Sequence, residues 1–413
     1  MQEVSLRGRI FYGWWLLVGL FLIYAASNGI LLNTMPRIFP NLAAEFGWTN
    51  EQATRPANMF FALVAFLNPV AGWLLDRYSI RRLMLIGTMG ITLVLALYPM
   101  VEELWQLMAL YVLFALSLSL AGLSPSLMLL SRWFVHYRGL AFGILMMASS
   151  LGGAAFPWLV NYFLPDWRLA VWVLAVLGGA MMILPTLFLV SNYPRDKGLA
   201  ADGVADPEPE VRPAPDRFIT VLANLVRSPV FYLLAFATGT LWFCIVAMLN
   251  NQALYFRNEL LLDDLSTTGI YSSFFFAAIV GKVLFGYLAD KFDKLKVMMA
   301  SVLNLGVGLA LLFLAVPGET TWPLAYAIVY GVGYAGAFTM IQLVIAEYYA
   351  GRNYGVCLGV FLLIDSLAGS LGGVYIAWSA DQFATYTPGF IVMMTLCAIA
   401  VACVSIMMRR HQR

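Results

Sequence analysis

Apolar runs of about twenty residues recur along the whole chain, and they constrain its fold more than any other feature. A run of this length crosses the hydrocarbon core of a bilayer as an α-helix. The composition agrees, because 62% of the 413 residues are hydrophobic and 11% are charged, with a mean hydropathy of +0.82. We therefore expect an all-α membrane protein with twelve spanning helices, at residues 11–35, 51–75, 82–101, 104–131, 138–164, 168–192, 228–256, 266–289, 295–316, 321–346, 353–378 and 386–408.

Lysine and arginine gather at alternate ends of these spans. One side has Arg7, Arg9, Arg77, Arg81, Arg82, Arg132, Arg138, Arg195, Lys197, Arg212, Arg217, Arg227, Lys291, Lys294, Lys296, Arg352, Arg409, Arg410 and Arg413. The other side has Arg37, Arg55, Arg168 and Arg257. By the positive-inside rule the richer side is cytoplasmic, and an even number of spans places both termini there. We expect an integral protein of a bacterial inner (plasma) membrane, whose net charge of +2 reflects topology rather than binding to nucleic acid.

A polar connector separates the sixth and seventh spans. The stretch NYPRDKGLAADGVADPEPEVRPAPDRF is rich in proline and in charges of both signs, and it has too few apolar residues to fold alone. It predicts an N-terminal six-helix bundle at residues 1–192, a cytoplasmic linker at 193–227 and a C-terminal six-helix bundle at 228–413. Two sets of six spans are the setting in which an internal repeat is expected.

Two short motifs occur once in each half. Residues 72–82 read GWLLDRYSIRR and residues 286–296 read GYLADKFDKLK, so that their glycines and aspartates align at an offset of 214. Residues 138–143, RGLAFG, and 354–359, YGVCLG, align at an offset of 216. Two matches at nearly one offset indicate an internal repeat.

The chain resembles the major facilitator superfamily, whose loop between helices 2 and 3 has a Gly-x-x-x-Asp-Arg pattern followed by basic residues. Within it the chain is most similar to the monocarboxylate porter and oxalate/formate exchanger branch, through FYGWW, EFGWT, NPVAGWLLDR, SRWFVHYRGLAFGI and DQFATYTPGF. The resemblance covers nearly the whole chain. It implies two pseudo-symmetric six-helix bundles that work by alternating access, and we expect a functional monomer.

The aspartate of each repeated loop stands at a predicted helix end among basic residues. A carboxylate there can hold charged partners or a helix N-terminus in one conformation and release them in another. The alternative is that these residues are solvated charges that only set the topology. The gating hypothesis names Asp76, Arg77, Arg81 and Arg138, with Asp290 and Lys291 in the second half.

Small residues recur at helical spacing in the fifth and eleventh spans. They let two helix backbones approach closely, and they could also let these helices slide against their neighbours. They are Gly139, Gly143, Ser150 and Gly153 in the fifth span, and Gly355, Gly359, Ser366, Gly369 and Gly373 in the eleventh.

Two ionisable residues lie deep within predicted spans. Lys282 lies eight residues before Asp290, about 12 Å along a helix, and Asp365 lies twelve residues after Asn353, about 18 Å. Each is near the middle of a hydrocarbon core about 30 Å thick. A charge there costs about 2.5–3.5 kcal/mol even on lenient insertion scales. We therefore expect Lys282 to face a central wet cavity, where water, an anionic substrate or Asp365 compensates its charge.

The resemblance gives Lys282 a role. In the branch that this chain resembles, a basic residue at this place in helix 8, followed four residues later by glycine, takes the substrate carboxylate, and Lys282 with Gly286 fits that spacing. Oxalate exchangers have a second basic residue in helix 11, where this chain has Asp365. The departure disfavours a two-cation oxalate clamp and favours a single carboxylate contact or proton coupling. The alternative is a fixed buried pair of Lys282 and Asp365 that only orients two helices.

Uncharged polar side chains could line the same cavity. Amides and phenols can form hydrogen bonds with a carboxylate without adding charge. Three consecutive amides in the seventh span cannot all face lipid, so at least one is expected to point inward. The candidates are Asn28, Asn250, Asn251, Gln252, Tyr330, Tyr334 and Gln342.

These patterns favour one function over several others. Constellations for acyl transfer, phosphate binding or zinc are missing and the cysteines lack metal-ligand spacing, so we expect no enzyme, cofactor or metal. The leading hypothesis is a secondary transporter of small organic anions, in particular monocarboxylates, coupled to protons through Asp365. One alternative is an exporter of larger amphiphiles or drugs. Another is a membrane sensor that binds a ligand without moving it, which would be expected to have a longer soluble segment.

Overall fold

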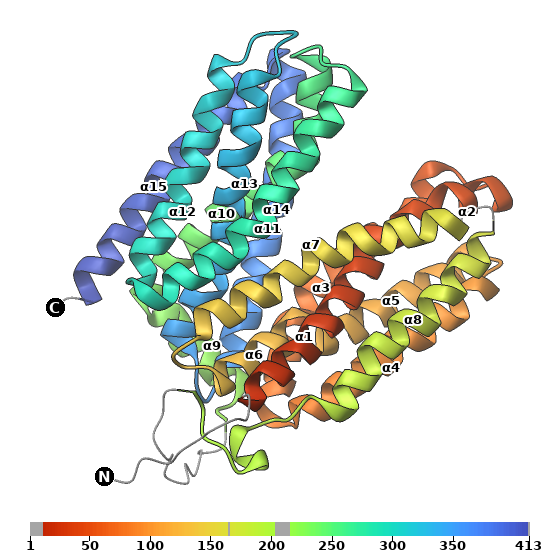
Figure 1. Cartoon of the computed structure of the whole chain (residues 1–413), viewed down its shortest axis with the longest axis vertical. Coiled ribbons are helices and arrows are strands. Elements are labelled where there is room, and N and C mark those ends of the chain that lie inside the picture. Colours follow the sequence, from red (N-terminus) through yellow and green to blue (C-terminus); the bar gives the residue numbers. More distant parts are fainter. Residues whose placement is uncertain (1–10, 164–165, 203–214, 412–413) are drawn as a thin grey trace. The chain divides into compact units, whose positions relative to one another are not determined.

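The computed structural model describes residues 11–163, 166–202 and 215–411. Within these ranges there is no β-strand, and twelve helical stretches are long and apolar enough to cross a membrane. The predicted all-α membrane architecture with twelve spans is confirmed (Figure 1). The chain forms two compact units, whose boundaries fall within the helices α3 (Asn50–Arg77) and α7 (Arg138–Phe163) as well as in the connector.

The described part of the first unit comprises residues 11–58, 78–137, 151–163 and 166–202. Its elements are α1 (Tyr12–Asn28), a π-helical segment (Gly29–Thr34), a 3-10 segment (Met35–Ile38), α2 (Phe39–Phe46), the first turns of α3, α4 (Ile80–Leu97), a 3-10 turn (Tyr98–Met100), α5 (Leu104–Ala121), α6 (Leu123–Trp133), the later part of α7, α8 (Trp167–Phe188) and a 3-10 turn (Pro194–Lys197). Within this unit α4 packs against α5 and α8, and α1 packs against α8 (Figure 1).

The described part of the second unit comprises residues 59–77 of α3, 138–150 of α7 and 215–411. Its other elements are α9 (Phe218–Arg227), α10 (Pro229–Asn258), α11 (Asp264–Lys291), α12 (Lys294–Leu311), a 3-10 turn (Leu312–Leu314), α13 (Thr321–Tyr349), α14 (Tyr354–Phe383) and α15 (Thr387–His411). Here α13 packs against α11 and α12, while α10 packs against α14 and α15. The predicted division into bundles at 1–192 and 228–413 stays a prediction.

Side-chain oxygens start several of these helices. The first backbone N–H groups of a helix have no partner within it, and a serine or aspartate just before the helix can accept from them. These residues are Ser79 for α4, Asp166 for α8, Asp263 for α11 and Asp293 for α12.

The first span is interrupted and longer than the sequence predicts. The prediction ends it at residue 35, but the helical path continues through the π-helical and 3-10 segments to Phe46. Pro36 lacks a backbone N–H and sits in the first turn of the 3-10 segment, where that group needs no helical partner. The hydroxyl of Thr34 donates to the carbonyl oxygen of Gly29 at 2.8 Å, which supplies a partner inside the widened turn. Proline therefore changes the helix type here without ending the helical path.

The linker has structure that the sequence prediction leaves out. Residues 194–197 form a 3-10 turn, and α9 occupies residues 218–227. Val221 and Leu225 lie one turn apart and are buried, so α9 packs one apolar face against its unit. Tertiary packing of two side chains, rather than overall apolar content, stabilises this short helix.

Candidate functional site

The Lys282 ammonium is enclosed by α7. Lys282 lies on α11 and is 0% exposed. Its Nζ donates to the carbonyl oxygen of Met146 at 3.2 Å, to Oγ of Ser149 at 3.0 Å and to Oγ of Ser150 at 2.8 Å. A lysine ammonium has three N–H donors, and three acceptors are present. Neutral dipoles from one helix therefore satisfy the ammonium.

Two aromatic rings of α13 complete the surroundings of this ammonium. Nζ of Lys282 lies 4.9 Å from the ring centroid of Phe338 and 5.7 Å from that of Tyr334. The negative face of an aromatic ring attracts a cation at these distances. In the part of the chain that the structure describes, no carboxylate lies within 4.0 Å of this nitrogen. The site is therefore a cation without an opposite charge. The expectation that Lys282 faces a wet cavity is wrong for this structure, because neighbouring side chains and backbone cover the residue completely.

Asp365 lies on α14 and is 1% exposed. Neither of its carboxyl oxygens makes a hydrogen bond within the described ranges. The hydroxyl of Thr238 on α10 lies near this carboxyl but donates to the carbonyl oxygen of Ala235 at 3.4 Å. The hypothesis of a fixed ion pair between Lys282 and Asp365 is wrong for this structure, because equal depth in the membrane does not make two side chains face each other.

The polar residues predicted to line one central cavity do not all lie together. Tyr334 contacts Lys282 through its ring, as described above. Tyr330 instead donates its hydroxyl to the carbonyl oxygen of Cys244 at 2.8 Å. Gln342 is 0% exposed and makes no side-chain hydrogen bond within the described ranges. Asn28 lies in the first unit, where its carbonyl oxygen accepts from Asn33 at 3.3 Å.

The three consecutive amides of α10 do not act as a set. Asn250 is exposed, whereas Asn251 and Gln252 are buried. Nδ2 of Asn251 donates to the carbonyl oxygens of Ala247 at 2.9 Å and Gly373 at 3.2 Å. Oε1 of Gln252 accepts from the hydroxyl of Tyr326 at 3.0 Å. Two of the three amides therefore point inward, where they join neighbouring helices.

The aspartates of the repeated loop motif cap helices that lie far away in the sequence. Asp76 accepts from the backbone N–H groups of Gly355 at 2.8 Å and Val356 at 3.0 Å, in the first turn of α14. A carboxylate at a helix N-terminus accepts from unpaired N–H groups and interacts favourably with the helix dipole. The gating hypothesis allows Asp76 to hold either charged partners or a helix N-terminus. In this structure it holds the N-terminus of α14.

The second loop motif repeats this contact on α7. Asp290 accepts from the backbone N–H groups of Gly139 at 2.6 Å and Leu140 at 2.8 Å. Glycines bring the paired helices close, because a Cβ on Gly72 would overlap the carbonyl oxygen of Gly355 and one on Gly286 would overlap that of Gly139. The two repeats of the sequence thus become two matched contacts within the second unit.

The other predicted gating residues lie beside these caps. Arg138 lies 4.0 Å from the Glu347 carboxylate, which Lys294 also approaches at 3.0 Å. Arg77 packs over the ring of Trp73 at 4.8 Å, and Lys291 packs over that of Tyr287 at 5.7 Å.

Arg81 interacts differently, within the first unit. Its side chain donates to the carbonyl oxygen of Thr186 at 3.3 Å and to that of Leu187, near the end of α8. A cation at a helix C-terminus is favourable for the helix dipole. Arg81 therefore joins α4 to α8.

The sequence profile of the Major Facilitator Superfamily matches residues 16–373 and, in a second overlapping match, residues 252–413. The chain belongs to the Major Facilitator Superfamily. Its family and fold are those of a membrane transporter rather than an enzyme.

Curated superfamily relatives span most of the chain at low identity. YcxA of Bacillus subtilis, an uncharacterized MFS-type transporter, is 20% identical over 396 residues, covering 94% of this chain and 92% of that protein. Monocarboxylate transporter 13 of Bos taurus is 23% identical over 390 residues, covering 92% and 86%. The agnestins efflux protein AgnL12 of Paecilomyces divaricatus is 25% identical over 309 residues, covering 73% and 66%. The names of the bovine and fungal relatives refer to different kinds of cargo, and that of YcxA to none.

Solved structures of superfamily transporters share the fold. FucP in the outward conformation superimposes with a TM-score of 0.73 at 15% identity, covering 95% of this chain and 97% of that one. The human organic anion transporter MFSD10 (TETRAN) gives a TM-score of 0.71 at 15% identity, covering 95% and 98%. The predicted major facilitator fold is confirmed.

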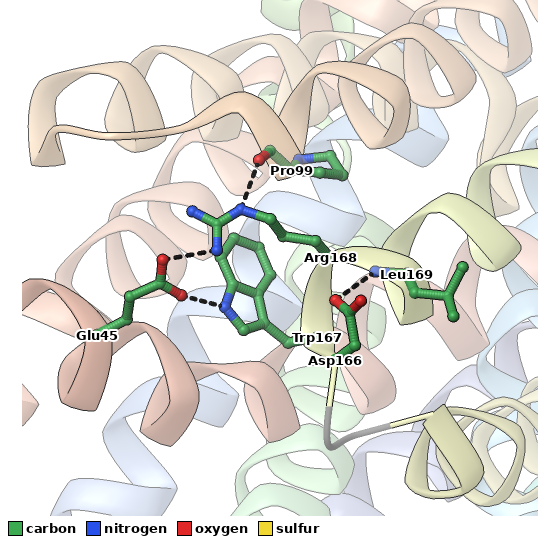
Figure 2. Close-up of polar contacts among 6 residues, drawn as sticks. All are labelled: Glu45, Pro99, Asp166, Trp167, Arg168 and Leu169. Atoms are coloured by element: carbon green, nitrogen blue, oxygen red, sulfur yellow. Dashed lines mark hydrogen bonds and ion pairs between the residues drawn. The ribbon is translucent and has the colours of Figure 1, made fainter.

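A polar cluster in the first unit joins three segments of this superfamily member. The carboxylate of Glu45 on α2 accepts from Nε1 of Trp167 and from Nη1 of Arg168, both at 2.6 Å (Figure 2). Nε of Arg168 donates to the carbonyl oxygen of Pro99 at 3.1 Å. Figure 2 also shows Asp166 turned toward the start of α8. The cluster joins α2 to α8 and to the turn after α4, so it fixes the far end of the interrupted first span.

Sequence reasoning missed the hydroxyl groups that hold Lys282. Ser150 is in the small-residue pattern of the fifth span, but Ser149 is not, and neither was assigned to the site. A serine on a small helix face is compatible with packing alone, and the signal that distinguishes these two is an ammonium supplied by another helix. Phe338 was missed for the same reason, since an isolated phenylalanine in an apolar run gives no sign of a cation next to it.

Proposed function

We propose that the chain is a secondary transporter that moves a small monocarboxylate by alternating access. The observation that carries this proposal is the Lys282 ammonium, whose hydrogen bonds and ring contacts within the described ranges are all with uncharged groups. A buried charge without a counter-charge is costly. A bound carboxylate supplies that counter-charge, and charge-assisted hydrogen bonds to carboxylates are stronger than neutral ones.

A single carboxylate suits this chain better than two. Lys282 and Asp365 are the buried charged residues within the described ranges, so a second carboxylate on the substrate would have no second buried cation to bind. Human MFSD10 is described as an organic anion transporter and bovine transporter 13 as a monocarboxylate transporter, and both descriptions agree with an anionic cargo.

Asp365 is the candidate for proton coupling. Its carboxyl group is buried and has no hydrogen-bond partner within the described ranges, so neither oxygen is already committed to another group. When Asp365 is protonated, its negative charge no longer competes with the substrate anion for Lys282. Entry of a proton therefore favours entry of a carboxylate. Tyr334 and Gln342, on the same face of α13 at helical spacing, remain candidates for contact with the substrate body.

Alternating access requires some helix contacts to break, and the caps of Asp76 and Asp290 are suited to this. Each cap is a charged group on backbone N–H groups, so it can be remade without repacking of side chains. By the positive-inside rule these caps lie on the cytoplasmic side of a bacterial inner membrane, with both termini on that side. The transporter is proposed to work as a monomer.

Export of larger amphiphiles is the second candidate. AgnL12 is named as an efflux protein, and an aromatic stack lies next to Lys282 in this chain. Phe274 lies 5.2 Å from Tyr334 and 6.2 Å from Tyr330, which lies 5.1 Å from Tyr326, between ring centroids. An apolar cargo could bind such rings without a carboxylate. Competition by simple carboxylates distinguishes the candidates, because it would leave amphiphile export unchanged.

Uptake into proteoliposomes tests the leading proposal. Purified protein is reconstituted and given radiolabelled lactate, pyruvate or acetate. Lys282→Ala should abolish saturable uptake, while Lys296→Ala, at an exposed position on α12, should not. Wild-type uptake by Lys282→Ala would refute the carboxylate-binding role.

The same assay tests proton coupling. Asp365→Asn removes the titrating group but keeps its shape and polarity, so uptake should lose its dependence on an imposed pH gradient. Ser366→Ala, at the next position on α14, should keep that dependence. A wild-type pH dependence in Asp365→Asn would refute the coupling role.

A further inference from the structure

The hydroxyls on α7 occupy the positions that a bound anion would otherwise fill. All three N–H donors of Lys282 are used, two of them by the hydroxyls of Ser149 and Ser150. The third bonds to the carbonyl oxygen of Met146, which also accepts from the Ser149 hydroxyl at 2.8 Å. The ammonium therefore has a complete set of partners with no ligand bound.

This set occurs in only one of the two sequence repeats. At the repeat offset of 216, Ser149 corresponds to Asp365 and Ser150 to Ser366, and at 214 Lys282 corresponds to Asn68. The backbone contacts are matched, since a Cβ on Gly143 would overlap the carbonyl oxygen of Lys282 and one on Gly359 would overlap that of Asn68. The Ser366 hydroxyl, however, donates to the carbonyl oxygen of its own helix at Leu362, 2.7 Å away. The serines on α7 are therefore not a general feature of this helix pairing.

The state of Lys282 in an empty carrier decides the mode of transport. A carrier that performs net movement must return empty after each delivery. If removal of the substrate leaves a buried ammonium without partners, the return is opposed by the desolvation of that charge, and the carrier can only exchange one anion for another. If the chain supplies replacement partners, the empty form can also change conformation.

We propose that Ser149 and Ser150 stand in for the substrate carboxylate on Lys282, so that the empty carrier can return and the protein performs net transport rather than obligatory exchange. Hydroxyl groups suit this exchange of partners because each rotates about one bond and both donates and accepts. When a carboxylate arrives it binds the ammonium, and the serine hydroxyls keep or regain hydrogen bonds to backbone carbonyl oxygens of their own helix, as Ser149 already has to Met146. This inference rests on the proposed carboxylate transport.

Two flux measurements on the same proteoliposomes test it. Net uptake is measured into vesicles without internal substrate, and exchange is measured into vesicles preloaded with the unlabelled carboxylate. In Ser149→Ala/Ser150→Ala the ratio of net uptake to exchange should fall by about tenfold or more, because two hydrogen bonds to a charged group are lost only from the empty form. Ser150→Ala alone should lower the ratio in the same direction by a smaller factor, and it serves if the double variant does not fold.

The control is Ser366→Ala, which removes the hydroxyl at the equivalent position of the other repeat. Its ratio of net uptake to exchange should equal that of the wild-type protein. A ratio unchanged in the α7 variants, or net uptake and exchange reduced in equal proportion, would overturn the inference. Exchange without net uptake in the wild-type protein would overturn it as well. If the wild-type protein moves no carboxylate in either assay, the proposed function itself fails, which is a separate outcome.

Discussion

Oδ1 of Asp76 lies 2.8 Å from the backbone nitrogen of Gly355, although 279 residues separate them in the chain. The same type of contact joins Asp290 to Gly139, with a separation of 151 residues. Each contact links one copy of the loop motif to a helix of the other half of the sequence. A repeat found by aligning letters is therefore also a repeat of physical interactions.

Asp76→Asn should impair transport more than stability. The amide keeps the size of the side chain but loses its charge and one acceptor, which weakens a helix cap by about 1 kcal/mol. Uptake should fall severalfold, whereas the melting temperature should fall by only a few degrees.

The matched control for this cap is Asp293→Asn. Asp293 caps α12 by accepting from the backbone of Lys296 at 3.0 Å, which is a contact local to one helix. The Asp293→Asn variant loses the charge but keeps an acceptor oxygen, so it should lower the melting temperature by no more than Asp76→Asn does and leave uptake unchanged. Equal loss of uptake in both variants would show that the Asp76 cap has no special part in the transport cycle.

Gly286→Ala should destabilise the protein. A Cβ at this position would overlap the carbonyl oxygen of Gly139, so α7 and α11 must separate, at a cost of about 1–3 kcal/mol. Gly306→Ala on α12 is the control, because no atom lies within 4 Å of a Cβ there. That change should stabilise by about 0.5–1 kcal/mol through the better helix propensity of alanine. Thermal unfolding in detergent measures both, and a similar shift in the two variants would argue against tight packing at Gly286.

Lys282→Met should abolish carboxylate uptake without lowering the melting temperature. Methionine fills a similar volume, and replacing a buried cation by an apolar side chain is often neutral or stabilising, by about 1–4 kcal/mol for whole ion pairs. Thermal shift and uptake on one preparation separate the two effects. A large loss of stability would mean that the Ser149 and Ser150 bonds are chiefly structural.

Glu45→Gln should have a small effect on stability that depends on salt. The Glu45 and Arg168 side chains are 38% and 39% exposed, and ion pairs at such exposure contribute about 0–1 kcal/mol. The hydrogen bond from Trp167 can persist to the amide oxygen. The difference in melting temperature from wild type should shrink between low and high salt, and a large difference independent of salt would contradict this reading of the cluster.

The architecture was predictable because the membrane imposes a strong pattern on sequence. Spans about twenty residues long and alternating positive charge fix the number of helices. The path of the first span beyond residue 35 was not predictable, since Pro36 normally signals a helix end and here only changes the helix type. The helix α9 was not predicted, because the polar, proline-rich residues that precede it are typical of a linker that is unstructured throughout.

The site was predictable only in part, for a geometric reason. Lys282 stands out because any charge in an apolar run is unusual, and Tyr334 was named with it. Position along a helix gives depth in the membrane but not the direction in which a side chain points. The sequence therefore does not reveal that Asp365 and Lys282 do not contact each other. The partners that Lys282 has, Ser149 and Ser150, lie more than 130 residues away and are common residues on small helix faces.

The donors at the two caps are main-chain amides, which every amino acid except proline has. The hydrogen bonds to Asp290 and Asp76 therefore set no requirement on the side chains of Leu140 and Val356. A proline at either position would delete a donor outright. Homologous sequences should therefore lack proline at both positions, whichever other residue packing admits there.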